Sequence, residues 1–283
     1  MQIAQYYQPA TLDEAAKILR DNTNIKILAG GTDLIIALRE RHVKAEGLLD
    51  ISRIGLSRIY IDDGTLHVGS MATFHQIESN SLVQKHCPML AEAASQVGAP
   101  QIRARATIGG NVANAATAAD SLPVLLAMDA QAVVVNADGR RMVRVEDLLT
   151  GVNQTALDPG DILTEFVLPI YENAFMAFEK IGRRQALAIS RINLGMRIHL
   201  ENGVVAHSAI AVGAVGKTAY RVRALEESLT GKALTGEAME QACGMLDNIV
   251  AEKLGARKTA PYKRRIAAAV LKRAFERMQG GDE

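Results

Sequence analysis

The first clear pattern of apolar and polar positions lies near the N-terminus, in the stretch PATLDEAAKILRDN at residues 9–22. Its apolar side chains recur at the spacing expected for one face of an α-helix. Thr11 stands where an N-cap residue belongs, and Glu14 follows it at the spacing of a capping box. The pattern predicts an amphipathic helix that begins after Thr11.

Shorter apolar runs follow this helix. Residues 25–28 predict a buried strand that ends in a glycine turn, residues 34–42 predict a helix, and residues 46–54 predict a second strand. From residue 57 the apolar positions alternate, which indicates short strands, and Asp63-Gly64 is a typical hairpin turn between two of them.

The middle of the chain mixes helices with strands. Apolar positions predict one helix over residues 81–98 and another over residues 120–128. Asp138-Gly139 predicts a second hairpin, and residues 161–169 predict a strand that closes this part of the chain. This mixture of hairpins and helices is typical of an α+β fold.

A new pattern begins after residue 169. Residues 174–184 and 192–215 predict an antiparallel sheet, with a hairpin turn at Asn202-Gly203. Apolar faces at helical spacing then predict three helices, at residues 221–231, 235–253 and 260–278. We therefore predict a domain boundary near residue 170.

Composition narrows the class of function. Lys and Arg total 32 against 31 Asp and Glu, so the net charge is +1, and aromatic residues make up 4%. Balanced charge and few aromatic side chains argue against a nucleic-acid partner. The N-terminus lacks the basic start and apolar run of a signal peptide, and no apolar run is long enough to span a bilayer. We therefore expect a cytoplasmic protein with no membrane partner.

The sequence predicts no metal site and no catalytic residue. Cys87 and Cys243 are too few to hold an iron–sulfur cluster or a cysteine-rich zinc site, and the six histidines lack metal-binding spacing. His199 and His207 fall in predicted strands, where we expect a structural role. The motifs of serine hydrolases and protein kinases do not occur.

The stretch LAGGTDL, residues 28–34, begins at the last residue of the strand predicted over residues 25–28. Gly30 and Gly31 have no Cβ, so a ligand could approach the main chain and successive N–H groups could surround an anion. The stretch lacks the G-x-G-x-x-G pattern of a Rossmann site and the lysine of a Walker phosphate loop. Taken alone, it is better explained as a glycine turn that ends a strand.

A second glycine pair occurs in TIGGNVANAATAAD, residues 107–120. Gly109 and Gly110 precede Asn111 and a run of small side chains that ends at Asp120. Two turns of the form apolar–Gly–Gly–polar favour one extended ligand between them, because a pyrophosphate needs several N–H donors without bulky neighbours. Two unrelated turns that match by chance remain the alternative.

Asp120 has two explanations. An Asp near a bound dinucleotide commonly accepts hydrogen bonds from sugar hydroxyls. The same residue is also placed to cap the helix predicted after it. Farther along, Arg183, Arg184 and Arg191 form a basic group, which we interpret as a solvated edge, with a contact to a phosphate or a partner subunit as the alternative.

Together, LAGGTDL and the stretch GAPQIRARATIGGNVANAATAADSLPVLLAMDA resemble the FAD-binding subunits of molybdenum hydroxylases. That family includes xanthine dehydrogenase, nicotinate dehydrogenase and the medium subunit of carbon monoxide dehydrogenase. The stretches DILTEFVLP and AFEKIGRRQALAIS and the C-terminal sheet and helices extend the resemblance over essentially the whole chain.

The resemblance implies a particular domain organisation. Residues 1–170 would form a FAD-binding domain of the vanillyl-alcohol-oxidase type, with subdomains of about 1–55 and 56–170. Residues 171–283 would form a C-terminal flavoprotein domain with an antiparallel sheet and helices.

The resemblance also implies which residues bind FAD. The two glycine motifs would contact the pyrophosphate from two sides, Asp120 would accept from ribityl or ribose hydroxyls, and Leu163 and Lys180 match FAD contacts of relatives. Some relatives have an aromatic residue where Val97 stands here, and some have their lysine where Glu179 stands. The implied cofactor-binding residues are Ile27, Leu28, Ala29, Gly30, Gly31, Thr32, Asp33, Leu34, Thr107, Ile108, Gly109, Gly110, Asn111, Asp120, Leu163 and Lys180.

The function implied by the resemblance is an electron relay. A molybdopterin-binding large subunit oxidises the substrate, a small subunit with two [2Fe-2S] clusters carries electrons to FAD, and an acceptor such as NAD⁺ is reduced. We expect an oxidoreductase subunit of the xanthine dehydrogenase type, serving purine or N-heterocycle oxidation. A non-catalytic assembly protein that retains the fold, and a stand-alone FAD oxidoreductase, are the alternatives.

Overall fold

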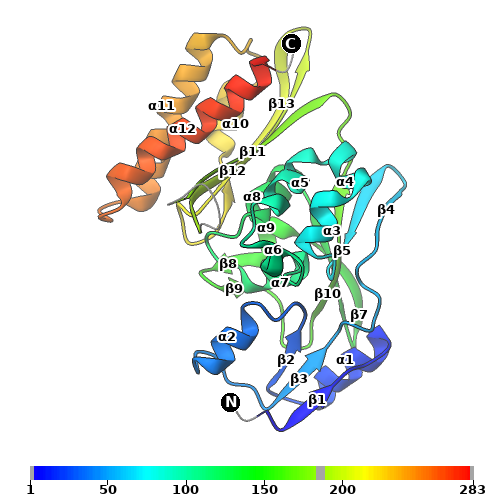
Figure 1. The fold of residues 1–283 in the computed structure, drawn as a ribbon. Coiled ribbons are helices and arrows are strands. Elements are labelled where there is room, and N and C mark those ends of the chain that lie inside the picture. The colour runs from blue at the N-terminus through cyan, green and yellow to red at the C-terminus, as the bar shows by residue number, and fades with distance from the viewer. Residues whose placement is uncertain (1–2, 183–188, 281–283) are drawn as a thin grey trace.

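The N-terminal part of the chain forms a small parallel sheet. We analysed a computed structural model that describes residues 3–182 and 189–280 (Figure 1). The sheet has the order β1-β3-β2, and helices α1 and α2 follow its first and second strands in sequence. The elements are β1 (Gln5–Tyr7), α1 (Leu12–Asp21), β2 (Ile25–Leu28), α2 (Leu34–Arg39) and β3 (Gly47–Asp50). The predicted strands and helices are confirmed, whereas β1 is too short to give a sequence pattern.

The predicted cap of α1 is confirmed in part. The Thr11 hydroxyl oxygen accepts a hydrogen bond from the N–H of Glu14 at 3.2 Å. The Glu14 carboxylate accepts from the N–H of Ala10 at 2.9 Å rather than from that of Thr11, so the reciprocal half of the capping box is shifted by one residue.

The middle of the chain is built on an antiparallel sheet of order β4-β5-β10-β6-β7. Its strands are β4 (Ile59–Asp62), β5 (Thr65–Gly69), β6 (Gln131–Asn136), β7 (Gly139–Arg144) and β10 (Ile162–Pro169), and a separate pair consists of β8 (Leu149–Gly151) and β9 (Gln154–Thr155). Both predicted hairpins are present, because β4 pairs with β5 and β6 pairs with β7.

Helices accompany this sheet in the middle of the chain (Figure 1). They are α3 (Phe74–Ser79), α4 (Ser81–His86), α5 (Pro88–Ser95), α6 (Pro100–Arg103), α7 (Ile108–Asn114), α8 (Ser121–Ala127) and α9 (Val145–Leu148). The prediction of one helix over residues 81–98 is wrong. Pro88 has no N–H to donate and its ring clashes with the preceding turn, so one helix ends at His86 and another starts at Pro88.

The C-terminal part is an antiparallel sheet of order β11-β12-β13-β14 with three helices, as predicted. Its elements are β11 (Ala174–Gly182), β12 (Ser190–Glu201), β13 (Val204–Gly213), β14 (Tyr220–Arg221), α10 (Arg223–Leu229), α11 (Gly236–Leu254) and α12 (Ala260–Gln279). Side chains of β11 alternate between two cores: Phe178 packs with the middle of the chain and Ala177 packs with the C-terminal helices. The sheet is therefore buried on both faces.

One face of this sheet packs against the middle of the chain, and the other face packs against the C-terminal helices. Helices α5 and α8 contact β11, β12 and β13, while α10 and α12 contact the same sheet through the other core. The proposed division of the chain at residues 55 and 170 stays a prediction.

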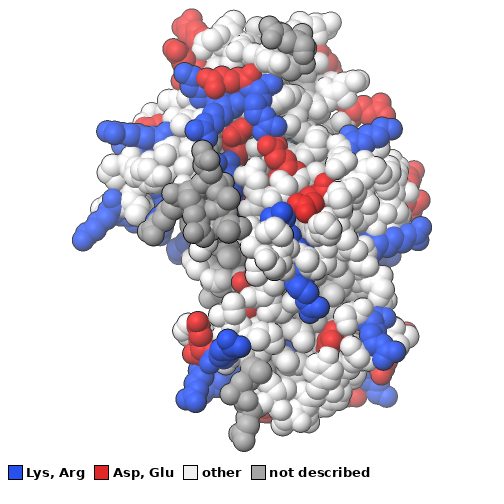
Figure 2. All heavy atoms as spheres, viewed as in Figure 1, with Lys and Arg blue, Asp and Glu red and all other residues white. Residues whose placement is uncertain are grey.

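Within the described residues, neither a membrane-spanning helix nor a metal-binding cluster is found. No helix there is both long enough and apolar enough to cross a membrane, and no cluster of three or more His, Cys, Asp or Glu side chains could hold a metal ion. On the face shown in Figure 2, basic and acidic side chains are interspersed. Cys87 and Cys243 are free thiols.

Candidate functional site

Both glycine motifs line one cleft with a volume of about 660 Å³. Twelve of the sixteen residues predicted to bind the cofactor lie along it: Ile27, Ala29, Gly30, Gly31, Thr32, Asp33, Leu34, Thr107, Gly110, Asn111, Asp120 and Lys180. Leu28, Ile108, Gly109 and Leu163 do not line it. The sequence therefore indicated segments that line one cleft, although four of the predicted residues do not line it.

The first motif supplies free hydrogen-bond donors. Strand β2 ends at Leu28, and Gly31 adopts a φ of 75°, which a residue with a Cβ rarely adopts. Within the described residues, the N–H groups of residues 30–33 donate to no protein acceptor. These residues are half-buried or exposed, so their N–H groups are open to a bound molecule, and several successive donors suit an anionic or oxygen-rich ligand.

The second motif is the first turn of helix α7 rather than a free loop. Thr107 caps this helix, and its hydroxyl oxygen accepts from the N–H of Gly110 at 3.1 Å. The N–H groups of Ile108 and Gly109 donate to the carbonyls of Ala72 and Ser70 at 3.1 and 2.8 Å. The two motifs are therefore unequal, because the N–H groups of Ile108, Gly109 and Gly110 are paired within the described part of the protein and those of residues 30–33 are not.

A hydrogen bond joins the two motif segments. The Asn114 amide, near the end of α7, donates to the Asp33 carboxylate at 3.2 Å. Gly30 fits closely behind the first turn, since a Cβ at this position would overlap the Arg105 carbonyl oxygen. These contacts fix the position of the first turn relative to α7 and so define the shape of the cleft.

The two glycines of the second motif have different surroundings. A Cβ on Gly109 would lie 2.7 Å from both the Cβ and the carbonyl oxygen of Ser70. A Cβ on Gly110 would meet only the Thr107 hydroxyl oxygen, at 3.1 Å. Gly109 is therefore required by the packing of the chain on itself, and Gly110 leaves space in the cleft.

Asp120 is held by side chains from the C-terminal sheet. Its Oδ2 accepts from Lys180 Nζ at 2.6 Å, and its Oδ1 accepts from Ser190 Oγ at 2.6 Å and Asn193 Nδ2 at 2.7 Å. Asp120 does stand at the N-cap position of α8, as one interpretation expected, but its side chain makes no capping hydrogen bond to that helix. The carboxylate is instead part of the cleft wall, 8% exposed, as is the Lys180 side chain.

Ser190 and Asn193 were not identified from the sequence. They belong to β12, whose other central side chains are mostly apolar and buried. A polar residue inside such an apolar strand needs a partner, and this is the signal that the sequence offered. Arg183 and Arg184 of the basic group lie outside the described residues.

The small residues before Asp120 have neighbours on two sides. Ala116, Ala118 and Ala119 line the cleft. From the other side, the N–H of Ala214 donates to the Thr117 carbonyl at 2.6 Å, and Asn193 Nδ2 donates to the Ala119 carbonyl at 3.3 Å. Their small size therefore allows the close approach of the C-terminal sheet as well as of a ligand.

Apolar side chains from two segments of the chain also line the cleft. Ile27, Ala37 and Val43 contribute from the N-terminal segment, and Val97 and Ile102 contribute from the segment around α6. Flat apolar or aromatic ligand groups favour such surroundings. With the donor-rich turn and the Asp120 carboxylate, the cleft suits a dinucleotide: donors for a diphosphate, an acceptor for sugar hydroxyls, and apolar surfaces for rings.

Comparison with known proteins identifies the family. A family model described as the FAD-binding domain in molybdopterin dehydrogenase matches residues 2–171, and one described as the carbon monoxide dehydrogenase flavoprotein C-terminal domain matches residues 176–278. The chain belongs to the FAD-binding subunits of molybdenum hydroxylases. The resemblance noted in the sequence is confirmed, as are the fold class and FAD as the cofactor.

Individual relatives match over nearly their full length. The nicotinate dehydrogenase FAD-subunit of Eubacterium barkeri is 32% identical, with 98% of each chain covered. The xanthine dehydrogenase FAD-binding subunit of Escherichia coli O157:H7 is also 32% identical, with 96% of this chain and 94% of the relative covered. Among solved structures, carbon monoxide dehydrogenase from Hydrogenophaga pseudoflava superposes with a TM-score of 0.91 at 31% identity, covering 97% of this chain and 96% of the other.

The cleft of this flavoprotein subunit fits FAD by its own geometry. Its volume of about 660 Å³ lies within the range of small-molecule sites, and the unpaired N–H groups of residues 30–33 are the donors that a diphosphate requires. Lys180 lies on the cleft, whereas Glu179 pairs with Arg277 at 3.1 Å, so the lysine at position 180 is the one in reach of a ligand. The FAD roles of the individual residues remain predictions.

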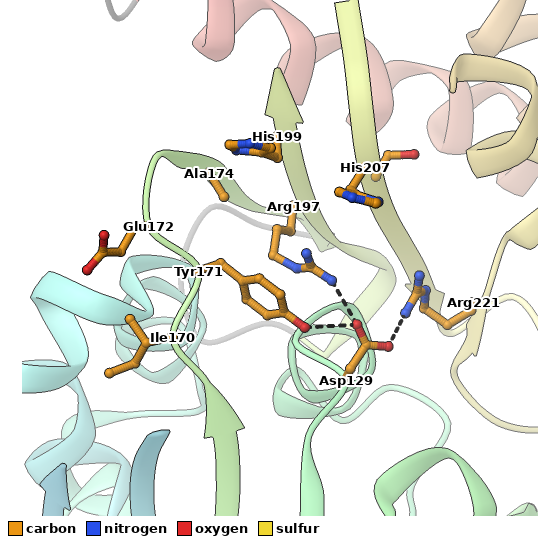
Figure 3. A pocket seen from close by; sticks show the side chains of 10 residues that line it. Asp129, Ile170, Tyr171, Glu172, Ala174, Arg197, His199, His207 and Arg221 are labelled. Atoms are coloured by element: carbon orange, nitrogen blue, oxygen red, sulfur yellow. Dashed lines mark hydrogen bonds and ion pairs between the residues drawn. The ribbon is translucent and has the colours of Figure 1, made fainter. Parts of the chain in front are cut away.

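A second pocket of about 510 Å³ lies where Tyr171 and Asp129 meet the C-terminal sheet (Figure 3). Asp129 accepts hydrogen bonds from Arg197 at 2.7 Å, Arg221 at 2.6 Å and the Tyr171 hydroxyl at 3.2 Å. The Arg197 guanidinium lies over the Tyr171 ring, 3.5 Å from its centre. Burial raises the pKa of Tyr171 and lowers that of Arg197.

Asp129, just after α8, forms ion pairs with Arg197 and Arg221 of the C-terminal sheet. These pairs connect the end of α8 to that sheet. His199 and His207 also line this pocket, opposite each other on β12 and β13. Their predicted placement in strands is confirmed.

Proposed function

We propose that this subunit receives electrons from a small partner with two [2Fe-2S] clusters, which is itself reduced by a molybdopterin-binding large subunit, and passes them through FAD to an acceptor such as NAD⁺. The observation that carries the proposal is the dinucleotide-shaped cleft in a chain of this family. FAD, when bound, supplies a carrier that can take up single electrons and release a pair.

The protein's own task in this proposal is binding and positioning. The N–H groups of residues 30–33 would donate to the diphosphate, while Gly110 leaves room for it to approach α7. Asp120 would accept from sugar or ribityl hydroxyls, and Lys180 would keep a positive charge beside them. Val97 and Ile102 would offer an apolar surface to a ring system.

Two relatives favour a nitrogen heterocycle as the substrate of the complex. One is the nicotinate dehydrogenase FAD-subunit of Eubacterium barkeri, and the other is the xanthine dehydrogenase FAD-binding subunit of Escherichia coli O157:H7. We therefore propose a xanthine dehydrogenase-like complex that oxidises purines or related N-heterocycles in the cytoplasm. The substrate would bind in the large subunit of such a complex.

The alternatives make different demands on the cleft. An assembly protein that had lost the cofactor would not need the free donors of residues 30–33 or the buried Asp120–Lys180 pair. A stand-alone FAD oxidoreductase would need substrate-activating groups beside the cofactor. Among the described residues that line the cleft, the ionisable side chains are Lys26, Asp33, Asp120 and Lys180.

The test is reconstitution with FAD followed by addition of NADH. A visible flavin spectrum at one FAD per chain, and bleaching of that spectrum by NADH under anaerobic conditions, are the expected results. A chain that binds no FAD would refute the proposed function. Binding of FAD without bleaching by NADH would refute only NAD⁺ as the acceptor. Co-purification with a molybdenum subunit and an iron–sulfur subunit tests the assembly.

A further inference from the structure

We infer that Ser190 and Asn193 are positioning residues for FAD, and that they act by holding the Asp120 carboxylate in the cleft. This inference rests on the proposed function of the cleft. It concerns two residues of the C-terminal sheet that the glycine motifs do not indicate.

The first observation is the convergence of donors on one carboxylate. Lys180, Ser190 and Asn193 donate to Asp120 at 2.6, 2.6 and 2.7 Å, and each comes from 60 or more residues farther along the chain. Lys180 also donates to the Gln96 carbonyl at 2.9 Å, next to Val97 on the cleft. The network thus connects α8, the segment before α6, and the first two strands of the C-terminal sheet.

The second observation is an irregularity in β12. Ile181 pairs with Ile192 and Gly182 pairs with Ser190, so β12 has one extra residue, Arg191, between these pairs. In a regular strand, residues three apart point to opposite faces of the sheet. The extra residue shifts this alternation, so that Ser190 and Asn193 both reach the same Asp120 oxygen.

The third observation is an unsatisfied atom. Asn193 is fully buried, and its Oδ1 has no hydrogen-bond donor among the described residues. Leaving a buried amide oxygen unpaired lowers stability. Asn193 therefore gives up one hydrogen bond while its Nδ2 contacts Asp120 and the carbonyl of Ala119. The Asn193 side chain is therefore placed to direct its Nδ2 donor at Asp120 rather than to satisfy its own amide in the core.

The consequence for the cofactor follows from the position of Asp120. The residue directly precedes helix α8, where an Asp side chain commonly turns to bind the first N–H groups of the helix. The donors from β12 hold it away from those groups and keep one oxygen next to Lys180. Without them the carboxylate gains other rotamers, and FAD binding then has to restore the one that faces the cleft.

The experiment compares Ser190→Ala and Asn193→Ala with the wild-type chain in a titration with FAD, followed by quenching of flavin fluorescence. We expect the Kd to rise about threefold for Ser190→Ala and about tenfold for Asn193→Ala, the latter being equivalent to about 1.4 kcal/mol. The visible circular dichroism of the bound flavin should change in both variants, because the groups around it become less ordered. Ser190→Thr retains a hydroxyl and should retain wild-type affinity.

Ser208→Ala is the matched control. Ser208 lies on the neighbouring strand β13 and donates to the Glu226 carbonyl at 3.4 Å, away from the cleft. Its affinity for FAD should equal that of the wild type. If Ser190→Ala and Asn193→Ala bind FAD within twofold of the wild type, or if Ser190→Thr fails to restore affinity, the inference is wrong. If the wild type itself binds no FAD, the proposed function fails instead.

Discussion

The two adjacent glycines of the second motif should respond in opposite ways to the same substitution. In Gly109→Ala, the new methyl group would lie 2.7 Å from the Cβ and carbonyl oxygen of Ser70, so the backbone has to move. Overpacking of this kind costs about 1–3 kcal/mol of stability. In Gly110→Ala, the methyl group meets only the Thr107 hydroxyl oxygen at 3.1 Å, which needs a small adjustment.

The magnitudes follow from these contacts. Both glycines lie in α7, where alanine is favoured over glycine by up to about 1 kcal/mol. Gly110→Ala should therefore leave the unfolding free energy of the apoprotein unchanged or slightly higher, whereas Gly109→Ala should lower it by up to about 2 kcal/mol after a helix preference of about 1 kcal/mol is subtracted. In the cleft, the methyl group of Gly110→Ala should weaken FAD binding roughly 5- to 150-fold, for a steric cost of about 1–3 kcal/mol.

The assay is a pair of measurements on each variant: denaturant unfolding of the apoprotein and a fluorescence titration with FAD. The reasoning requires that Gly109→Ala loses stability and that Gly110→Ala loses affinity. Wild-type FAD affinity in Gly110→Ala would show that the diphosphate does not approach this part of α7. A loss of stability in Gly110→Ala as large as that in Gly109→Ala would show that the two surroundings do not differ as the structure indicates.

Two further predictions concern groups away from the cleft. Burial opposes ionisation of Asp161, but hydrogen bonds from Arg141, Asp158 and Asn136 outweigh it and lower its pKa, so Asp161→Asn should cost about 1–3 kcal/mol at neutral pH, with Arg141 left able to reach solvent. Because the folded-state pKa is depressed, this contribution is complete above the unfolded value of about 4 and is lost as the pH falls through the folded value. Equal loss of stability on mutation at neutral and at strongly acidic pH would contradict the assignment. Burial raises the pKa of Cys87 to about 12 and that of Cys243 to about 11, so alkylation followed by mass spectrometry should modify Cys243 before Cys87 in the folded protein and both rapidly after unfolding. Prior labelling of Cys87 would show that the junction between α4 and α5 opens more readily than the burial of this thiol suggests.

Local patterns in the sequence were sufficient for most elements of the fold. The apolar periodicity and hairpin turns located the C-terminal sheet and its three helices, because those signals depend on neighbouring residues only. The helix over residues 81–98 failed at Pro88, where a single residue overrides a continuous apolar pattern. Strand β1 is three residues long, and its pairing with β3 depends on residues more than 40 positions away.

The candidate site could be predicted only in part from the sequence, because its geometry also depends on contacts between distant residues. The two glycine pairs share a visible pattern, and both do line the cleft, the first through Gly30 and Gly31 and the second through Gly110. The pattern could not show that Gly30 and Gly109 are required by contacts with Arg105 and Ser70. A glycine selected for packing and a glycine selected for a ligand look alike in a sequence, and only the position of a missing Cβ separates them.

Asp120 illustrates how a long-range contact can decide between two local interpretations. From its neighbours alone, a helix cap and a hydroxyl acceptor were both reasonable. Lys180, Ser190 and Asn193, which the sequence places at least 60 residues away, turn the carboxylate away from the helix N–H groups, and its role as a hydroxyl acceptor stays a prediction. Because those donors belong to the C-terminal sheet, the orientation of Asp120 in the cleft depends on the docking of that sheet against α8. In this family of flavoprotein subunits, the C-terminal sheet would then be part of the cofactor site itself, and loosening its contact with α8 should weaken FAD binding even when both glycine motifs are intact.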